Sequence, residues 1–251
     1  MRPARMVLVV ANAGDAVASA FVRRYARQGV RLLRPSDLSR LGWRYEIGDH
    51  AGPSQAVVAG RACPEGRLAG VITRLVSVTP ADLPHIKPAD RAYVAQEMQA
   101  FLLAWLHRLP CPVLNRPTPV CLAGDWWSPQ TWIHRACRLG IPVTRSEWRV
   151  VRGLRTKAIQ PVTGESSTVS ITVVGSQVIG NVTPCVAQYA RRLAQAAELE
   201  LVTVRFSSSN NDARFLDASL WTNLADRTIA AAVMRHVMRQ CPSIRREAAP
   251  A

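Results

Sequence analysis

The chain lacks the patterns that identify several common classes of protein. No apolar run approaches the roughly 18 residues of a membrane span. The six cysteines form no Cys-x-x-Cys pair and no structural-zinc spacing with histidine. The three-glycine dinucleotide fingerprint, the P-loop and the Gly-x-Ser-x-Gly nucleophile elbow are also absent. The sequence therefore carries no signature of a membrane protein, a zinc finger, a Rossmann dehydrogenase or a serine hydrolase.

Acidic residues are scarce relative to basic ones. Lysine and arginine number 32 against 17 acidic residues, which gives a net charge of +15, and nearly all the positive charge is arginine. Arginine suits bidentate recognition of phosphate and carboxylate, so the charge fits a polyanion, an acidic peptide or an acidic partner subunit. It equally fits an arginine-rich genome composition and a solvated surface. Without an RNA-binding or zinc-finger motif, nucleic-acid binding stays unspecific.

The N-terminal apolar run, residues 6–11, is too short for the core of a signal peptide and precedes no convincing cleavage site. We expect it to be the first strand. A cytoplasmic protein with free thiols and no membrane association follows from this expectation.

The first half predicts an open α/β sheet. A buried strand at residues 6–11, a helix over residues 17–28 that stops at Gly29, and a strand at residues 30–33 form a strand–helix–strand unit. A short helix is expected at residues 36–42. Further strands are predicted at residues 43–47, 55–60 and 68–74, with a turn around Pro64. A long helix is predicted from an apolar stripe at helical spacing: Met98, Phe101, Leu102, Trp105, Leu106 and Leu109.

The second half predicts helices packed on an antiparallel sheet. Ser128 and Pro129 are a helix N-cap and first residue, and Gly140 ends that helix. Residues 168–174 and 177–180 alternate like a β-hairpin. The remaining predictions are a helix from residue 184, strands at residues 201–206 and 213–218, and a helix over residues 223–239.

The segment from Asp90 to Thr144 places an amphipathic helix, the strand-like PVLNRP, a proline-started helix and a short strand at residues 141–144 in that order. This order resembles the domain that precedes the catalytic core in RimK-type ATP-grasp ligases, particularly those that modify ribosomal peptides. The Val-Val-Gly strand that ends at Gly175, and the elements after it, resemble the end of that core. The resemblance implies an open α/β pre-ATP-grasp domain (residues 1–145), a truncated α+β ATP-grasp lobe (146–242) and a flexible tail (243–251).

The resemblance also implies a chemistry in which a carboxylate is phosphorylated and an amine displaces the phosphate. Two acidic residues and an asparagine near the C-terminus would then hold magnesium. At the matching positions stand Arg205, Asp217 and Ser219. Arginine cannot ligate magnesium, so Asp217 is the candidate ligand. The alternative for Asp217 is an ion pair with Arg205 or Arg214.

The interval between Thr144 and Ile171 is short. Only 26 residues fill it, where the family has a whole subdomain that closes over ATP. Lys157 and Arg152 are the candidate nucleotide-binding residues there, and Ser170 stands where peptide-modifying relatives carry an arginine. We expect much of one ATP-grasp lobe to be missing.

Three interpretations stay open. The first is a degenerate ATP-grasp protein without independent catalysis or cofactor, acting as a partner subunit in a biosynthetic or peptide-modification system. The second is an active, Mg-ATP-dependent carboxylate–amine ligase. The third is a basic α/β protein that binds nucleic acid or an anionic metabolite. In the first, the partner would be an acidic protein or a modified peptide. Its candidate surface residues are Trp126, Trp127, Arg149 and Arg205, with core packing as the alternative for the tryptophans.

Overall fold

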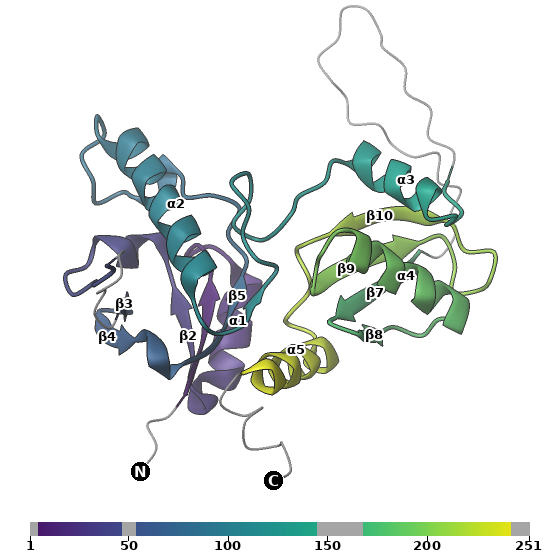
Figure 1. The fold of residues 1–251 in the computed structure, drawn as a ribbon, viewed down its shortest axis with the longest axis horizontal. Coiled ribbons are helices and arrows are strands. Elements are labelled where there is room, and N and C mark those ends of the chain that lie inside the picture. Colours follow the sequence, from purple (N-terminus) through teal and green to yellow (C-terminus); the bar gives the residue numbers. More distant parts are fainter. Residues whose placement is uncertain (1–4, 47–53, 145–167, 242–251) are drawn as a thin grey trace, which may run out of the picture.

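A computed structural model describes residues 5–46, 54–144 and 168–241. These residues form two lobes, each built on a four-stranded sheet (Figure 1). The candidate residues Arg149, Arg152 and Lys157 lie outside the described residues, as does the tail. None of the helices in these ranges is both long and apolar enough to cross a bilayer.

The first lobe contains a parallel sheet with helices on both faces. Successive strand residues point to opposite faces. Leu8 and Val10 therefore pack with Trp105 on one side, and Val7 and Val9 with Phe21 on the other. The strand order is β2-β1-β5-β6. The elements are β1 (Met6–Val10), α1 (Ala16–Tyr25), β2 (Val30–Leu33), β5 (Leu68–Thr73), α2 (Arg91–Arg108) and β6 (Val113–Leu114).

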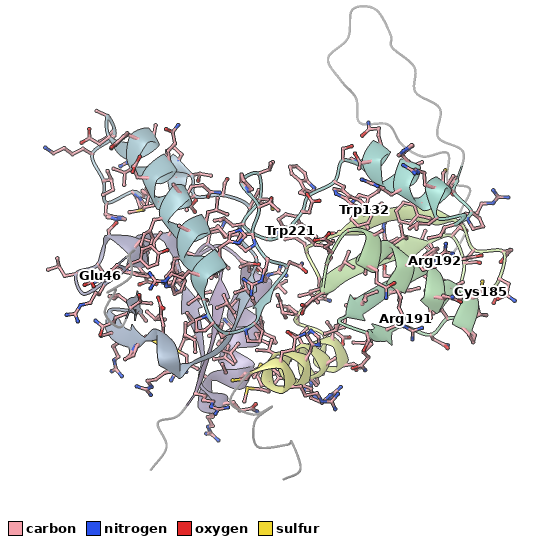
Figure 2. The ribbon with its side chains drawn as sticks, viewed as in Figure 1. Glu46, Trp132, Cys185, Arg191, Arg192 and Trp221 are labelled. Atoms are coloured by element: carbon pink, nitrogen blue, oxygen red, sulfur yellow. The ribbon has the colours of Figure 1, made fainter. Side chains whose placement is uncertain are left out.

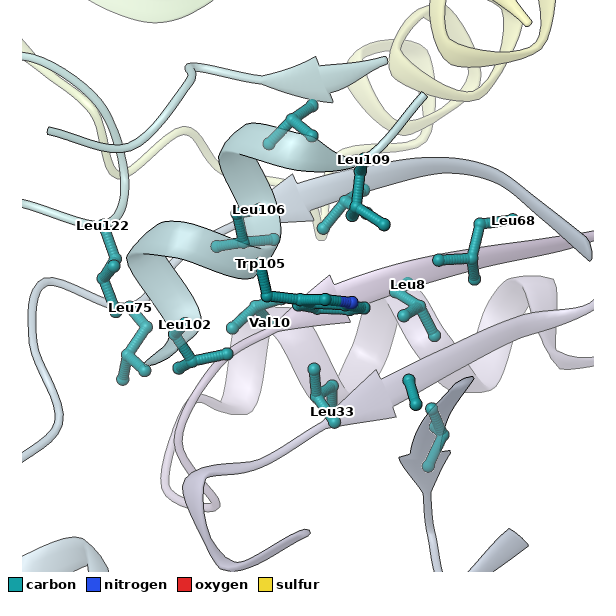
Figure 3. Packing of buried hydrophobic residues seen from close by; sticks show 14 of the residues in the cluster. Leu8, Val10, Leu33, Leu68, Leu75, Leu102, Trp105, Leu106, Leu109 and Leu122 are labelled. Carbon is teal, nitrogen blue, oxygen red and sulfur yellow. The ribbon is translucent and has the colours of Figure 1, made fainter. Parts of the chain in front are cut away.

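The predicted apolar stripe of α2 is core packing, as its spacing indicates. Trp105 is fully buried between Leu102 and Leu106 of its own helix and Leu8 and Val10 of β1 (Figure 3). Its indole nitrogen donates a 2.7 Å hydrogen bond to Glu65 Oε1, so burying the ring leaves no polar atom unsatisfied. This packing fixes α2 on the sheet.

Short elements complete the first lobe. Strands β3 (Gln55–Val58) and β4 (Arg61–Pro64) form a separate antiparallel hairpin. The expected strand at residues 43–47 is wrong for the described residues 43–46, which contribute only a single bridge, between Arg44 and Gln55. The predicted stop at Gly29 is confirmed, because Gly29 takes a left-handed φ of 84° after the last turn. The 3-10 helices are η1 (Ala26–Gln28), η2 (Pro35–Ser39), η3 (Glu65–Arg67) and η4 (Pro80–Asp82).

The second lobe is an antiparallel sheet with α3 (Pro129–Arg138) and α4 (Pro184–Ala196) on one face. Ile171, Val173, Val202 and Val204 point into a core that includes Trp132 of α3. The predicted strand at residues 141–144 contributes only a bridge between Val143 and Phe215. The strand order is β10-β9-β7-β8. The elements are α3 (Pro129–Arg138), β7 (Val169–Val174), β8 (Gln177–Ile179), α4 (Pro184–Ala196), β9 (Leu201–Phe206) and β10 (Phe215–Ser219).

The last helix, α5 (Arg227–Gln240), lies between the lobes and packs on β5 and β7 (Figure 1). Two glycines permit the close approach. A Cβ at Gly70 would lie 2.4 Å from Val237 Cγ1, and one at Gly175 would lie 2.2 Å from His236 Cε1. One apolar cluster therefore spans helix α5 and both sheets.

Asn115 joins the lobes directly. It follows β6 and adopts a left-handed φ of 55°, a conformation that asparagine tolerates better than most residues. Its Nδ2 donates to Leu201 O at 2.7 Å, and its Oδ1 accepts from Glu200 N at 3.0 Å and Leu201 N at 2.9 Å. The end of the parallel sheet is thereby fixed to the start of β9.

Candidate functional site

The face of the second sheet opposite α3 and α4 is polar, except at the end where Val174 and Leu201 pack against α5. The register pairs Ser170 with Arg205, Thr172 with Thr203, Arg205 with Asp217, and Thr203 with Ser219. Paired residues in an antiparallel sheet point to the same side. These six residues, here called the polar sheet face, therefore lie together on the side opposite α3 and α4: Ser170, Thr172, Thr203, Arg205, Asp217 and Ser219.

A β-bulge places Asp217 on this face. Phe215 pairs with Phe206 in the core, yet Asp217 pairs with Arg205, the very next residue back along β9. Two residues of β10 thus oppose one of β9, which reverses the side to which the following residues point. Without the bulge, Asp217 would share the core side of Phe215.

Arg205 engages both carboxylate oxygens of Asp217. Its Nε donates to Oδ1 at 2.7 Å, and its Nη2 donates to Oδ2. This hydrogen bonding to Asp217 raises the pKa of Arg205. The structure therefore brings together two residues that the sequence singled out, as a bidentate ion pair. Within the described ranges, no three His, Cys, Asp or Glu side chains gather as metal ligands would. The metal role of Asp217 stays a prediction.

A cavity of about 740 Å³ opens over part of the polar sheet face. Thr172 Oγ1 and Thr203 Oγ1 are 3.2 Å apart, and Thr203 donates to the buried Thr222 at 3.2 Å. Asp226, the acidic residue of the lining, caps α5 by accepting from two backbone N–H groups. In the described part of the chain the lining includes no lysine or arginine. Hydroxyl and amide groups from Ser170, Thr172, Thr203, Asn181, Asn223 and Thr228 lie beside the apolar Ile179, Ile229 and Trp221.

A second cavity, of about 340 Å³, lies at the carboxyl ends of β1 and β5. From β1 the chain continues to β2 on one side, and from β5 it continues to β6 on the other side. The strand order therefore reverses between β1 and β5, and open α/β sheets bind ligands at such a reversal. The buried Arg74 donates from Nε to Asp15 Oδ2 at 2.8 Å and from Nη1 to Thr222 O at 2.7 Å. Trp221 lines both cavities and lies between the lobes (Figure 2).

The adjacent tryptophans before α3 have different environments. Trp126 is 58% exposed. Trp127 packs on Trp132 with ring centroids 4.8 Å apart, and its Nε1 donates to Asp125 Oδ2 at 2.7 Å. The Arg135 guanidinium lies 5.2 Å from the Trp127 ring centroid, within cation–π range. Trp127 thus packs into the second lobe and Trp126 faces solvent; a partner contact at Trp126 stays a prediction.

Sequence reasoning missed Arg74, Thr222 and Trp221. Arg74 ends the predicted strand at residues 68–74, and a charged residue where a parallel strand ends is a signal that could have found it. Trp221 had no such signal, because it belongs to an irregular segment after β10.

Comparison with known proteins identifies the fold. No family model matches the chain, and no curated protein does. Three solved structures are similar. The ATP-grasp ligase PsnB, complexed with precursor peptide PsnA2 and AMPPNP, has a TM-score of 0.64 at 15% identity, over 94% of this chain and 99% of PsnB. A Chryseobacterium gregarium RiPP-associated ATP-grasp ligase, in complex with ADP and a leader and core peptide, has a TM-score of 0.64 at 9% identity. The match covers 95% of this chain and 98% of that ligase. The macrocyclase MdnC from Microcystis aeruginosa, bound with precursor peptide MdnA, has a TM-score of 0.64 at 12% identity. The match covers 92% of this chain and 99% of MdnC. The predicted fold is therefore confirmed: the chain has the fold of the RiPP-associated ATP-grasp ligases.

Proposed function

We propose that this chain is a binding or partner subunit of a ribosomal-peptide-modification system, with the fold of an ATP-grasp ligase but without its magnesium–nucleotide chemistry. The similar structures of PsnB and MdnC contain precursor peptides, which supports a role in such a system. The missing lobe expected between residues 144 and 171 belongs to this proposal, since residues 145–167 lie outside the described ones.

The observation that carries the proposal is the ion pair between Arg205 and Asp217. The family resemblance assigns an acidic residue to the position of Arg205 and an asparagine to that of Ser219. Magnesium takes hard oxygen ligands in a strict geometry, yet both oxygens of Asp217 accept hydrogen bonds from a guanidinium. These residues do not fit a magnesium ion.

The positive charge of Arg205 matters even when the ion pair opens. The two side chains are 49% and 38% exposed, so solvent weakens the pair and its contribution to stability is small. An arginine remains charged at any accessible pH, however, and repels a divalent cation at the neighbouring carboxylate. The carboxylate alone is therefore a poor magnesium site.

The cavity over the polar sheet face also suits a ligand other than a triphosphate. A triphosphate needs lysine and arginine contacts, and the described lining contributes hydroxyl and amide groups. Such groups hydrogen-bond uncharged polar chains, including peptide backbone and side-chain amides. A peptide bound for presentation to another enzyme is the occupant that we propose.

The test restores the missing ligands. The double variant Arg205→Glu/Ser219→Asn, together with Asp217, provides the three oxygen ligands that the resemblance implies. We expect calorimetry to show magnesium-dependent ATP binding that is tighter than that of the unaltered protein. Arg214→Glu is the matched control, because it makes the same charge reversal at an exposed arginine near the start of β10.

Two results would count against the proposal. If the unaltered protein binds Mg-ATP as tightly as the double variant, Arg205 does not block the site. If Arg214→Glu gains as much affinity for Mg-ATP as the double variant, the gain comes from the change in overall charge. Either outcome favours the alternative of an active ligase or of a general anion-binding protein.

A further inference from the structure

Helices α1 and α5 form one continuous surface. Both pack on the same side of the parallel sheet, where Phe21 of α1 and Val233 of α5 belong to one buried cluster. Arg24 of α1 donates from Nη1 to Ala225 O, just before α5, at 2.9 Å. Figure 1 shows α5 next to α1.

The solvent side of this surface is rich in arginine. Six exposed arginines lie on α1, on α5 and on η1 directly after α1. We call this set the arginine face: Arg23, Arg24, Arg27, Arg227, Arg235 and Arg239.

No acidic residue offsets this charge along the helices. Residues 16–36 and 227–240, all of them described, include no Asp or Glu. The flanking Asp15 and Asp226 are helix N-caps that accept backbone N–H bonds, and Asp15 also pairs with Arg74. Elsewhere Arg74 and Arg205 have carboxylate partners. The arginine face has none among the described residues.

The chemistry of the face indicates what would bind it. Like charges on one surface repel one another, and an anionic partner relieves that repulsion. The planar guanidinium binds carboxylates through two parallel hydrogen bonds. Single-stranded nucleic-acid sites add exposed aromatic rings that stack on bases. The large exposed hydrophobic residues of the described chain all lie on other elements: Leu41, Tyr93, Val120, Trp126 and Trp221.

We infer that the arginine face docks an acidic segment of a protein partner. The inference rests on the proposed function in one respect, because a partner subunit needs a surface on which to dock. The six arginines line neither cavity described above. Docking on this face therefore leaves the polar sheet face open to a second ligand.

The test compares two triple variants of equal charge. Arg23→Gln/Arg27→Gln/Arg235→Gln removes three arginines of the face that make no hydrogen bond or ion pair within the described residues. The matched control removes three exposed arginines from other elements that likewise make none: Arg40→Gln, Arg61→Gln and Arg138→Gln. Both variants lower the net charge by the same amount. A difference in their binding therefore depends on where the arginines lie. Thermal unfolding checks that both are folded.

The probe is fluorescent decaglutamate, measured by anisotropy at physiological salt. Exposed ion pairs are individually weak, so losing three is expected to weaken binding by about tenfold in the arginine-face variant, against less than about twofold in the control. Equal weakening in both variants would overturn the inference, as would an unaltered protein that does not bind decaglutamate. A decanucleotide RNA that binds through the face while decaglutamate does not would make it a nucleic-acid surface. Binding of Mg-ATP would refute the proposed function and leave the decaglutamate result standing.

Discussion

Replacing Asn115 by alanine should weaken the junction between the two lobes and lower the free energy of unfolding. Asn115 is 3% exposed, and its side chain makes three hydrogen bonds to the backbone of Glu200 and Leu201. Alanine removes the carboxamide and leaves two N–H groups and one carbonyl at the junction without these partners. It must also adopt the left-handed φ of 55° that asparagine holds here.

The expected loss follows from those two effects. Each buried hydrogen bond contributes about 1 kcal/mol net, and more when its partner is left unsatisfied. A left-handed φ in alanine costs about 1 kcal/mol more. The sum is about 4 kcal/mol in the free energy of unfolding, a large share of the stability of an ordinary domain.

Urea unfolding followed by circular dichroism measures this loss. Asn115→Gly is the matched control, because glycine removes the same hydrogen bonds without the penalty for positive φ. The free energy of unfolding of Asn115→Gly should therefore exceed that of Asn115→Ala by about 1 kcal/mol. A loss below about 1 kcal/mol for Asn115→Ala would refute the reasoning, since it would mean that the junction contributes no more than one ordinary hydrogen bond.

Three further predictions concern the same junction and the thiols. Gly175→Ala should destabilise the protein by about 2 kcal/mol or more, because the new Cβ would meet the His236 ring at 2.2 Å and φ is 58°. The double variant with His236→Ala should recover part of that loss in the same urea assay; no recovery would show that the ring is not the obstacle. The hydrogen bond from His236 lowers the pKa of Glu200, so its stabilising contribution is present above the unfolded glutamate pKa and is lost as pH falls through the lower folded pKa. His236→Ala should then raise the midpoint pH of acid unfolding, and an unchanged midpoint would count against this pair. Burial raises the pKa of Cys111 to about 12, so mass spectrometry should find iodoacetamide on the exposed Cys137 and none on Cys111 at neutral pH.

The strands could be predicted where burial imposes a clear pattern. Residues 6–11 are a continuous apolar run because β1 is covered on both faces, and the alternation of residues 168–174 reflects a sheet with one polar face. Strand β4 was missed because it buries only Cys63 and contains Pro64, so its residues resemble a turn. The predicted strand at residues 141–144 is extended but bonds to β10 at a single bridge.

Only part of the site could be predicted from the sequence, and its geometry could not. Arg205 and Asp217 were identified through the family resemblance. Their pairing on one face depends on the β-bulge after Phe215, which strict alternation does not reveal. Asn115 and Arg74 bond to residues 86 and 148 positions away, and no local pattern contains such a contact.

The most direct test of the central claim is a calorimetric titration of the unaltered protein with Mg-ATP, with ADP and magnesium-free ATP as controls. Because Arg205 holds the carboxylate of Asp217, we expect no magnesium-dependent binding up to millimolar nucleotide. Micromolar binding that requires magnesium would contradict the account. It would show that the polar sheet face, or residues beyond those described, forms a working nucleotide site.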